Sequence, residues 1–484
     1  MMERARRAQA RWAALPVEER ARRLRPAIDS LLERREQIAD IVCEENGKPR
    51  VEALLHEIGA SVGKLDWLCR EAPSILAPEA RRLTWMPTRR AEVHRVPHGV
   101  VLVISPWNVP LGIPLGQVAA ALLAGNAVVL KPSEVTPRCG AVVGELFAGC
   151  DLPSGLLQVV QGDGAVGASL IAQKPDKVLF TGSVATGRKV MKAAAEHPIP
   201  VGLELGGIDA LIVCDDADLE YAASAAAWGA TFNGGQVCAS VERLLVQASV
   251  YEPFLALLQD KLERVDPATE LGRITAQRQK RVYEHHLEDM KARGLDIRTG
   301  GEFIDELRLA PTLVAGEGVG ESAVWREESF GPLVAARPFD TDDQAVQLHD
   351  ATEFGLTASV FSRNPERARA LAGRLRVGLV SINDVGASLY GHAELPWGGV
   401  GQSGFGRSQG KEGLLELTYA KVIEDGPAGF EAKRPWWYPY DQDQLQLLSM
   451  FGQLIGSRSH LGRARLLARM GGRAARMVTR SPRL

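Results

Sequence analysis

One repeated pattern narrows the fold of this chain more than any other feature: a short apolar run ends in a Gly, Pro or Ser turn, and a helix-like run follows. Four such runs, VVLVIS, NAVVLKPS, LLQVVQG and DKVLFTGS, lie between residues 100 and 183. Apolar runs without polar alternation are typical of parallel strands buried on both faces, and parallel strands need crossover connections. The pattern therefore predicts a doubly wound α/β sheet.

A second alternating set follows from about residue 210. It contains the runs DALIVCD, ERLLVQ, TASVFS and VGLVSIN, with helix-like segments such as RARALAGRLR between them. A chain of 484 residues with 45% hydrophobic content is long enough for two or more domains. We therefore expect two α/β units.

The two ends of the chain differ from this body. Residues 16–69 carry apolar side chains at helical spacing, which predicts two or three amphipathic helices, and the start of AEVHRVPHGVVLVIS alternates like an exposed strand. After Asp443 the chain has eight arginines and no lysine or acidic residue. This tail predicts either an interfacial helix on an anionic membrane or a helix packed on the body or on a partner subunit.

Composition argues against several classes of protein. The six cysteines are scattered without a CxxC pair, which argues against a disulfide framework and against a metal site. No apolar region follows the basic N-terminus, and no apolar stretch is long enough to span a bilayer. A formal net charge of −2 gives no general attraction to nucleic acid. We expect a cytoplasmic protein, with a peripheral membrane location through the tail as the alternative.

Two turns have the residue types of a cofactor site. DKVLFTGSVATG places Gly182 and Ser183 after a strand, where backbone N–H groups can approach a phosphate. The spacing differs from the dinucleotide fingerprint, and an ordinary strand-to-helix turn explains it equally well. KPSEVTP adds Lys131 and Glu134, which suit the two hydroxyls of a ribose or, equally, a solvated turn.

Three further residues can carry chemistry. Glu204 ends the apolar run VGLE, where burial would raise its pKa and suit it to general-base work, although it could equally cap a helix or pair with an arginine. Cys238, in GGQVCAS, can attack a carbonyl carbon if a donor such as Asn108, in SPWNVP, stabilises the oxyanion. Taken alone, Cys238 is better explained as a small buried apolar residue.

Seven motifs together favour the catalytic interpretation. SPWNVP, KPSEVTP, FTGS, LELGG, GGQVCAS, EESFGP and LPWGGVGQSGFGR follow one another from residue 105 to 407. In this order they closely resemble the aldehyde dehydrogenase superfamily, from about Pro16 to Asp425. The resemblance implies an α/β fold with a Rossmann-type NAD-binding domain, an α/β catalytic domain, a small β oligomerisation arm and a basic C-terminal extension. Their expected bounds are 1–80 with 99–206, 207–410, 81–98 with 411–427, and 428–484.

The resemblance also implies roles for individual residues. Cys238 matches the nucleophile, which forms a thiohemiacetal and then a thioester, and Gln236 and its neighbouring glycines would shape the turn that presents it. Asn108 and the backbone N–H of Cys238 would hold the oxyanion, and Glu204 would activate the hydrolytic water. The implied NAD(P) contacts are Lys131 and Glu134 (adenosine ribose), Trp107 and Ser183 (pyrophosphate), Gly162 and Gly182 (cofactor cleft), Glu328 (nicotinamide ribose) and Phe330 (nicotinamide ring).

The implied substrate tunnel is apolar. Gly116 stands where some relatives carry a bulky ring, and no cation is evident that would anchor a second carboxylate. We therefore expect a medium-chain, long-chain or aromatic aldehyde as substrate and disfavour dicarboxylic semialdehydes. Glu134 would repel a 2′-phosphate, so NAD is expected over NADP. The expected tunnel residues are Val109, Ile113, Phe232, Val237, Ala239 and Trp397, the last in place of the usual phenylalanine.

Three alternatives remain open at this point. A coenzyme A-acylating dehydrogenase would share Cys238 but needs no base like Glu204. A non-catalytic NAD-binding descendant is disfavoured because Cys238, Glu204 and Asn108 are all present. A cysteine and histidine hydrolase would need a histidine in a comparable motif, and none of the nine histidines has one. The family resemblance further implies a homodimer or homotetramer.

Overall fold

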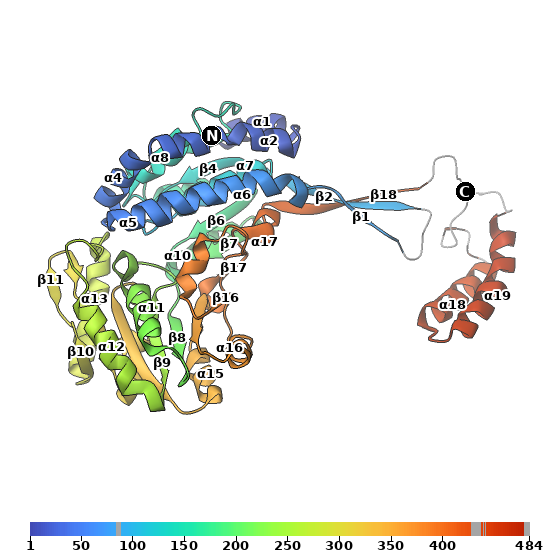
Figure 1. Ribbon diagram of the computed structural model, residues 1–484. Helices are drawn as coiled ribbons and strands as arrows, with labels where there is room; N and C mark the ends of the chain where they lie inside the picture. The colour runs from blue at the N-terminus through green and yellow to red at the C-terminus, as the bar shows by residue number, and fades with distance from the viewer. Residues whose placement is uncertain (84–88, 427–436, 439, 441, 479–484) are drawn as a thin grey trace. The chain divides into compact units, whose positions relative to one another are not determined.

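The computed structural model describes residues 1–83, 89–426, 437–438, 440 and 442–478 (Figure 1). The chain forms two compact units. One unit contains Met1–Pro78 and His94–Lys421, and the other contains Glu79–Val93 and Val422–Leu484.

The first sheet confirms the doubly wound pattern. Its six strands have the order β17-β7-β6-β3-β4-β5, and all neighbours are parallel except β17 and β7. Every residue of the two central runs VVLVI and AVVLK is buried, as expected for strands covered on both faces. The strands are β3 (Val100–Ile104), β4 (Ala127–Lys131), β5 (Leu157–Val159), β6 (Lys177–Thr181), β7 (Val201–Glu204) and β17 (Gly404–Phe405).

Helices connect and cover this sheet. The crossovers are α7 (Gly112–Leu123), α8 (Pro137–Leu146), α9 (Gly164–Ala172) and α10 (Val184–Ala195). The first helix, α1 (Met2–Ala13), packs on β3 and β4, and its buried Trp12 donates a hydrogen bond from the indole N–H to the carbonyl of Leu122 at 2.7 Å. An extra helix therefore precedes the segment in which amphipathic helices were predicted.

That predicted helical segment is more divided than its periodicity suggests. Pro26 begins a new helix because its ring favours the first helical turn, and Gly47 ends another with a left-handed φ of 89°. A π-helical turn, Ala53–Gly59, follows. The helices are α2 (Val17–Leu24), α3 (Pro26–Glu33), α4 (Arg35–Asn46), α5 (Arg50–Glu52) and α6 (Ala60–Ile75).

The second sheet has seven strands in the order β10-β13-β14-β9-β8-β15-β16, parallel except for β10 and β13. Successive residues of β8 enter different apolar cores: Leu211 and Val213 pack in one, and Ile212 packs in the other. The sheet is therefore buried on both faces. Its strands are β8 (Asp209–Val213), β9 (Val241–Gln247), β10 (Asp296–Thr299), β13 (Thr312–Ala315), β14 (Leu333–Phe339), β15 (Thr357–Phe361) and β16 (Leu379–Ile382).

The remaining helices and a small hairpin surround the second sheet. The helices are α11 (Leu219–Thr231), α12 (Tyr251–Glu263), α13 (Gln277–Ala292), α14 (Ala323–Arg326), α15 (Asp342–Asp350) and α16 (Pro365–Ala372), and the hairpin is β11 (Phe303–Asp305) with β12 (Arg308–Leu309). In chain order, the sheets change between the end of β7 and the start of β8, on either side of Gly206 and Gly207. The division into a cofactor domain and a catalytic domain at this point stays a prediction.

A small β arm is present. Its three strands, β1 (Glu79–Arg81), β2 (Arg90–Pro97) and β18 (Thr418–Asp425), have the order β1-β2-β18, and a short helix, α17 (Gly410–Leu415), precedes β18. The role of the arm in oligomerisation stays a prediction.

The C-terminal extension contains two helices, α18 (Gln442–Gly456) and α19 (His460–Val478), which pack against each other. Two of the eight tail arginines, Arg480 and Arg483, lie outside the described residues. Within the described part of the chain, no helix is both long enough and apolar enough to cross a membrane.

Candidate active site

The loop that carries Cys238 has a left-handed backbone conformation at three consecutive residues. It follows α11, and Asn233, Gly234 and Gly235 all have left-handed φ angles of 53°, 62° and 73°. A Cβ on Gly235 would lie 2.1 Å from the carbonyl of Gly331, so a side chain there is excluded. The two glycines therefore allow the sharp turn that leads into Cys238.

A network of side chains holds the same loop. The amide nitrogen of Gln236 donates to the carbonyls of Asn233 (3.0 Å) and Arg273 (2.8 Å), and its oxygen accepts from the backbone N–H of Thr275 at 2.9 Å. Because Gln236 is almost completely buried, these bonds satisfy its polar atoms and restrain the loop. The turn before Cys238 is therefore rigidly supported.

Asn108 follows β3 and lies against the loop of Cys238. Its backbone carbonyl accepts hydrogen bonds from the amine of Lys48 (3.1 Å) and the side-chain amide of Asn233 (3.1 Å). Asn233 thus joins the segments that carry Asn108 and Cys238. Among the described residues, the side-chain amide of Asn108 has no hydrogen-bond partner, which leaves it available to a group in the cavity that it lines.

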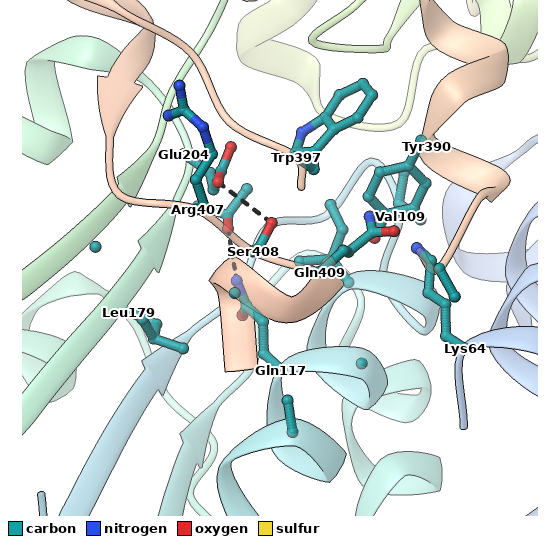
Figure 2. A pocket seen from close by; sticks show the side chains of 18 of the residues that line it. Lys64, Val109, Gln117, Leu179, Glu204, Tyr390, Trp397, Arg407, Ser408 and Gln409 are labelled. Atoms are coloured by element: carbon teal, nitrogen blue, oxygen red, sulfur yellow. Dashed lines mark hydrogen bonds between the residues drawn. The ribbon is translucent and has the colours of Figure 1, made fainter. Parts of the chain in front are cut away.

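Glu204 ends β7 with a half-satisfied carboxyl group. Its Oε1 accepts a hydrogen bond from the hydroxyl of Ser408 at 3.3 Å (Figure 2), and its buried Oε2 has no partner in the described residues. Burial raises the pKa of Glu204 to about 8, against smaller opposing effects of Ser408 and Arg407. A carboxylate with such a pKa is a good proton acceptor near neutral pH.

The thiol of Cys238 is not activated by its protein surroundings. Desolvation raises its pKa well above the ordinary range, and the negative charges of Asp209, Glu204 and Glu328 raise it further. Because the thiolate is the nucleophilic form, the thiol must lose its proton when it reacts.

A cavity of about 740 Å³ lies at the carboxyl ends of β3, β4 and β6 and at the start of α10. Asn108, Glu204 and Cys238 line it. Gly162, which was predicted to line the cofactor cleft, does not line this cavity. Gly162 has a φ of 145°, and a Cβ there would lie 2.5 Å from the side chain of Val166, so this glycine allows the turn before α9. The other predicted cofactor residues all line this cavity: Trp107, Lys131, Glu134, Gly182, Ser183, Glu328 and Phe330.

The first part of the cavity wall combines charge with a helix start. Buried Lys131 donates to Glu134 at 3.0 Å, and Ser183 caps α10 by accepting a hydrogen bond from the backbone N–H of Thr186. Backbone N–H groups at a helix N-terminus favour phosphate, and the lysine and carboxylate suit ribose hydroxyls. This wall fits the phosphate and ribose groups of a dinucleotide.

The second part of the wall lies near Cys238. Glu328 accepts a hydrogen bond from the backbone N–H of Gly207 at 3.1 Å, and a Cβ on Gly206 would lie 2.1 Å from the Glu328 carboxyl group. The Phe330 ring meets that of Trp107 edge-on, with 5.5 Å between ring centroids. Gly206 therefore makes room for the Glu328 carboxylate, and Trp107 and Phe330 form an aromatic part of the same cavity wall.

A second pocket shares lining residues with this cavity. Its walls include all six predicted tunnel residues, namely Val109, Ile113, Phe232, Val237, Ala239 and Trp397. Cys238 and Glu204 also line it. These two residues are therefore accessible both from the cavity of about 740 Å³ and from the apolar pocket.

Sequence reasoning missed several polar residues of the apolar pocket. They are His56 and, as Figure 2 shows, Lys64, Gln117, Tyr390, Ser408 and Gln409. The expectation that no cation lines this pocket is wrong, because Lys64 and Arg407 both do. Lys64 lies in α6 at helical spacing from the buried Ser61 and Leu68, a signal that could have placed it on the inner face. Its residue type argued the other way, since lysines are rarely buried.

Comparison with known proteins gives a consistent result. The family model described as "Aldehyde dehydrogenase family" matches residues 1–423. The 4,4'-diapolycopene aldehyde oxidase of Methylomonas sp is 42% identical over 467 residues, which cover 95% of this chain and 87% of the relative. The betaine aldehyde dehydrogenase of Cereibacter sphaeroides is 36% identical over 437 residues, 88% of each chain.

Solved structures agree with the sequence comparisons. The NAD-dependent aldehyde dehydrogenase of Sinorhizobium meliloti superimposes with a TM-score of 0.85 at 35% identity, covering 90% of this chain and 88% of that one. The betaine aldehyde dehydrogenase of Staphylococcus aureus, solved in complex with NAD+, gives a TM-score of 0.84 at 32% identity, covering 91% and 88%.

Proposed function

The chain belongs to the aldehyde dehydrogenase family, and on this basis we propose that it oxidises an apolar aldehyde to the carboxylic acid with NAD as the hydride acceptor. One observation carries the proposal: Cys238 and Glu204 line both the cavity of about 740 Å³ and the apolar pocket. A cofactor in the first and an aldehyde in the second would therefore meet at these two side chains.

In the first half of the reaction, the sulfur of Cys238 bonds to the aldehyde carbon as the thiol proton passes to water, and the carbonyl oxygen becomes an oxyanion. The Asn108 amide and the backbone N–H of Cys238 donate hydrogen bonds to it, which stabilises the thiohemiacetal. NAD, when bound, would supply the acceptor for the hydride that leaves this carbon. A thioester then remains on Cys238.

In the second half, Glu204 takes a proton from a water molecule that adds to the thioester carbonyl. The carbon–sulfur bond breaks, which releases the carboxylic acid, and the sulfur takes the proton back from Glu204, which restores the thiol of Cys238. The free Oε2 of Glu204 and the pKa of about 8 both suit this general-base role.

The cofactor proposal rests on the walls of the large cavity. Lys131 and Glu134 would hold the adenosine ribose, and Ser183 with the start of α10 would hold the pyrophosphate beside Trp107. The nicotinamide ribose and ring would lie against two further residues of the wall, Glu328 and Phe330. The Sinorhizobium and Staphylococcus relatives, described as NAD-dependent and as bound to NAD+, support this choice.

The substrate proposal rests on the apolar walls of the second pocket. The predicted tunnel residues are all apolar, and Phe232 stacks on Trp228 with 5.0 Å between ring centroids. One relative is named for the aldehyde of 4,4'-diapolycopene, an apolar hydrocarbon, and others for betaine aldehyde and succinate semialdehyde. The family thus accepts varied aldehydes, and the apolar walls favour a medium-chain, long-chain or aromatic one here.

A coenzyme A-acylating dehydrogenase is the second candidate. It would form the same thioester on Cys238 but transfer the acyl group to a thiol. The position of Glu204, with one unpaired carboxyl oxygen at the junction of the two cavities, favours hydrolysis instead. Analysis of the product with and without coenzyme A separates the candidates, since a free acid formed without coenzyme A requires hydrolysis.

Assembly and location are also part of the proposal. The β1-β2-β18 arm would join subunits into a homodimer or homotetramer, and the extension would contact a membrane surface or pack on protein. Light scattering gives the subunit number. Liposome flotation of the full chain and of a chain that ends at residue 455 tests the membrane role, which equal behaviour would exclude.

The experiment that tests the proposed reaction compares the parent protein with Cys238→Ala and Cys43→Ala. Cys43 is half-buried and lines neither cavity, so its variant is the matched control. We expect aldehyde-dependent reduction of NAD by the parent and by Cys43→Ala, and none by Cys238→Ala. Undiminished activity in Cys238→Ala, or no activity in the parent across linear and aromatic aldehydes, would contradict the proposal.

A further inference from the structure

The apolar pocket contains one buried amine that the proposed reaction does not use. Lys64 has 3% of its surface exposed, and its amino nitrogen lies 3.1 Å from the centre of the Tyr390 ring (Figure 2). Its neighbour on the other side is Gln409, whose amide oxygen, when oriented toward the amine, accepts a hydrogen bond at 3.2 Å. Both partners are electrically neutral.

The carboxylate whose charge acts on Lys64 is already engaged. Glu57 receives the amine of Lys48 at 2.5 Å on one oxygen and the backbone N–H groups of Leu111 and Gly112 at 3.1 and 2.7 Å on the other. In the described part of the chain, Lys64 itself forms no salt bridge. Its burial lowers its pKa well below the ordinary value.

A buried amine without an ionic partner lowers the stability of the folded protein. A polar group removed from water costs free energy unless it finds hydrogen-bond partners. A Cβ on Gly116 would lie 3.8 Å from the Lys64 side chain, so a bulky side chain at position 116 would compete with Lys64 for space. For a substrate that is apolar throughout, a leucine or methionine would line the pocket better.

We propose that Lys64 binds a second oxygen function of the substrate, a hydroxyl, carbonyl or carboxylate group carried on the apolar chain away from the carbonyl that Cys238 attacks. This inference rests on the proposed function and deepens it. The amine supplies the donor, Tyr390 and Gln409 hold it in position, and the substrate oxygen completes its hydrogen bonds. The preferred substrates are therefore bifunctional aldehydes.

The test uses Lys64→Met, which keeps the length of the side chain and removes the donor. The substrates are three aldehydes with the same number of carbons: a plain alkanal, its ω-hydroxy analogue and its ω-carboxy analogue, each offered over a range of chain lengths. In the parent we expect a higher kcat/KM for an oxygen-bearing aldehyde than for the alkanal. In Lys64→Met we expect this advantage to fall by about tenfold, with the alkanal unaffected or improved.

Lys192→Met is the matched control, because Lys192 is exposed on α10 and lines neither cavity. A loss for the ω-carboxy substrate alone identifies a charge pair, and a loss for both identifies a hydrogen bond; each supports the inference. An equal loss for all three aldehydes, or no change in their ratio, overturns it. If the variant does not fold, the kcat/KM ratios of the parent protein still test the inference. A parent that prefers alkanals to oxygen-bearing aldehydes at every chain length would contradict the inference.

The proposed function has a separate outcome. If the parent oxidises none of the three aldehydes, the proposed function fails. If it oxidises the alkanal but gains nothing from the second oxygen, only the role of Lys64 fails. A thermal melt gives a further readout: replacing a buried amine that has no ionic partner by methionine should raise the Tm of the ligand-free protein, and a lower Tm would contradict the inference that the amine is retained for the substrate.

Discussion

The two cavities that meet at Cys238 are built in different ways. The large cavity lies at the carboxyl ends of three neighbouring strands of one sheet, where Lys131 is paired with Glu134 and Glu328 with the backbone N–H of Gly207. The apolar pocket gathers side chains from α6, α7, the loop of Cys238 and the segments around Tyr390 and Ser408. Strand order therefore determines one site, and the packing of distant segments determines the other.

Because the two sites are built from different segments, the aldehyde pocket can change while the cofactor cavity stays the same. Residues at strand ends are constrained by the sheet that holds them, so the cofactor side offers few positions for change. Residues of the pocket sit on helices and loops whose inward side chains can be exchanged individually, as Lys64 beside Gly116 illustrates. Changes on one side of Cys238 should leave the other side unaffected.

The largest expected effect among these predictions concerns a residue that serves every aldehyde alike. Asn108→Ala removes the side-chain donor to the oxyanion, and we expect kcat to fall by about 10² to 10³. The loss should be similar for short, long and aromatic aldehydes, and equilibrium binding of NAD should be unchanged. A loss confined to one class of aldehyde would mean that Asn108 selects the substrate.

The pH dependence of thioester hydrolysis tests the residue that belongs to both cavities. Burial raises the pKa of Glu204 to about 8, and only its deprotonated form can accept a proton from water. Hydrolysis should therefore rise about tenfold per pH unit below pH 8 and level off above it. Stopped-flow measurements on a preformed acyl-enzyme can follow this step, and a profile that is flat between pH 6 and about 9 would argue against Glu204 as the base.

The smallest expected effect concerns the cofactor side alone. Glu134 lines the large cavity beside Lys131, and its negative charge would repel a 2′-phosphate. In Glu134→Gln, the ratio of kcat/KM for NAD to that for NADP should fall by up to about tenfold, because the carboxylate is partly screened by solvent. The order of preference among aldehydes should not change. A change in aldehyde preference would show that the cofactor cavity and the apolar pocket are not independent.

Much of the fold could be predicted because its signals are local. The uninterrupted apolar runs of β3 and β4 indicated buried parallel strands, and both strands are completely buried. The number of N-terminal helices was underestimated because helical periodicity continues across a break. The residues that cause these breaks, Pro26 and Gly47, act through backbone geometry that the periodicity does not register.

The site shows the same division between local and tertiary information. Motifs near strand ends identified seven of the eight predicted cofactor residues correctly as lining the large cavity, but Gly162 has a conformational role in a turn and lines neither of the two cavities described above. The hydrogen bond from the Asn233 side chain to the carbonyl of Asn108 joins segments 125 positions apart, so no local sequence pattern predicts it. Lys64 was missed because its residue type suggests solvent, whereas its helix places it inside.

The most direct test of the account is the mass of the covalent intermediate in Glu204→Gln. This variant should form the thioester and fail to hydrolyse it, so one equivalent of reduced cofactor should accompany each modified chain. With NAD and an aldehyde, we expect a mass increase equal to the aldehyde less two hydrogen atoms, located by peptide mapping on Cys238. An unmodified chain that turns over normally, or an adduct on another residue, would contradict the central claim. That claim is that Cys238 forms the thioester and Glu204 activates the water that hydrolyses it.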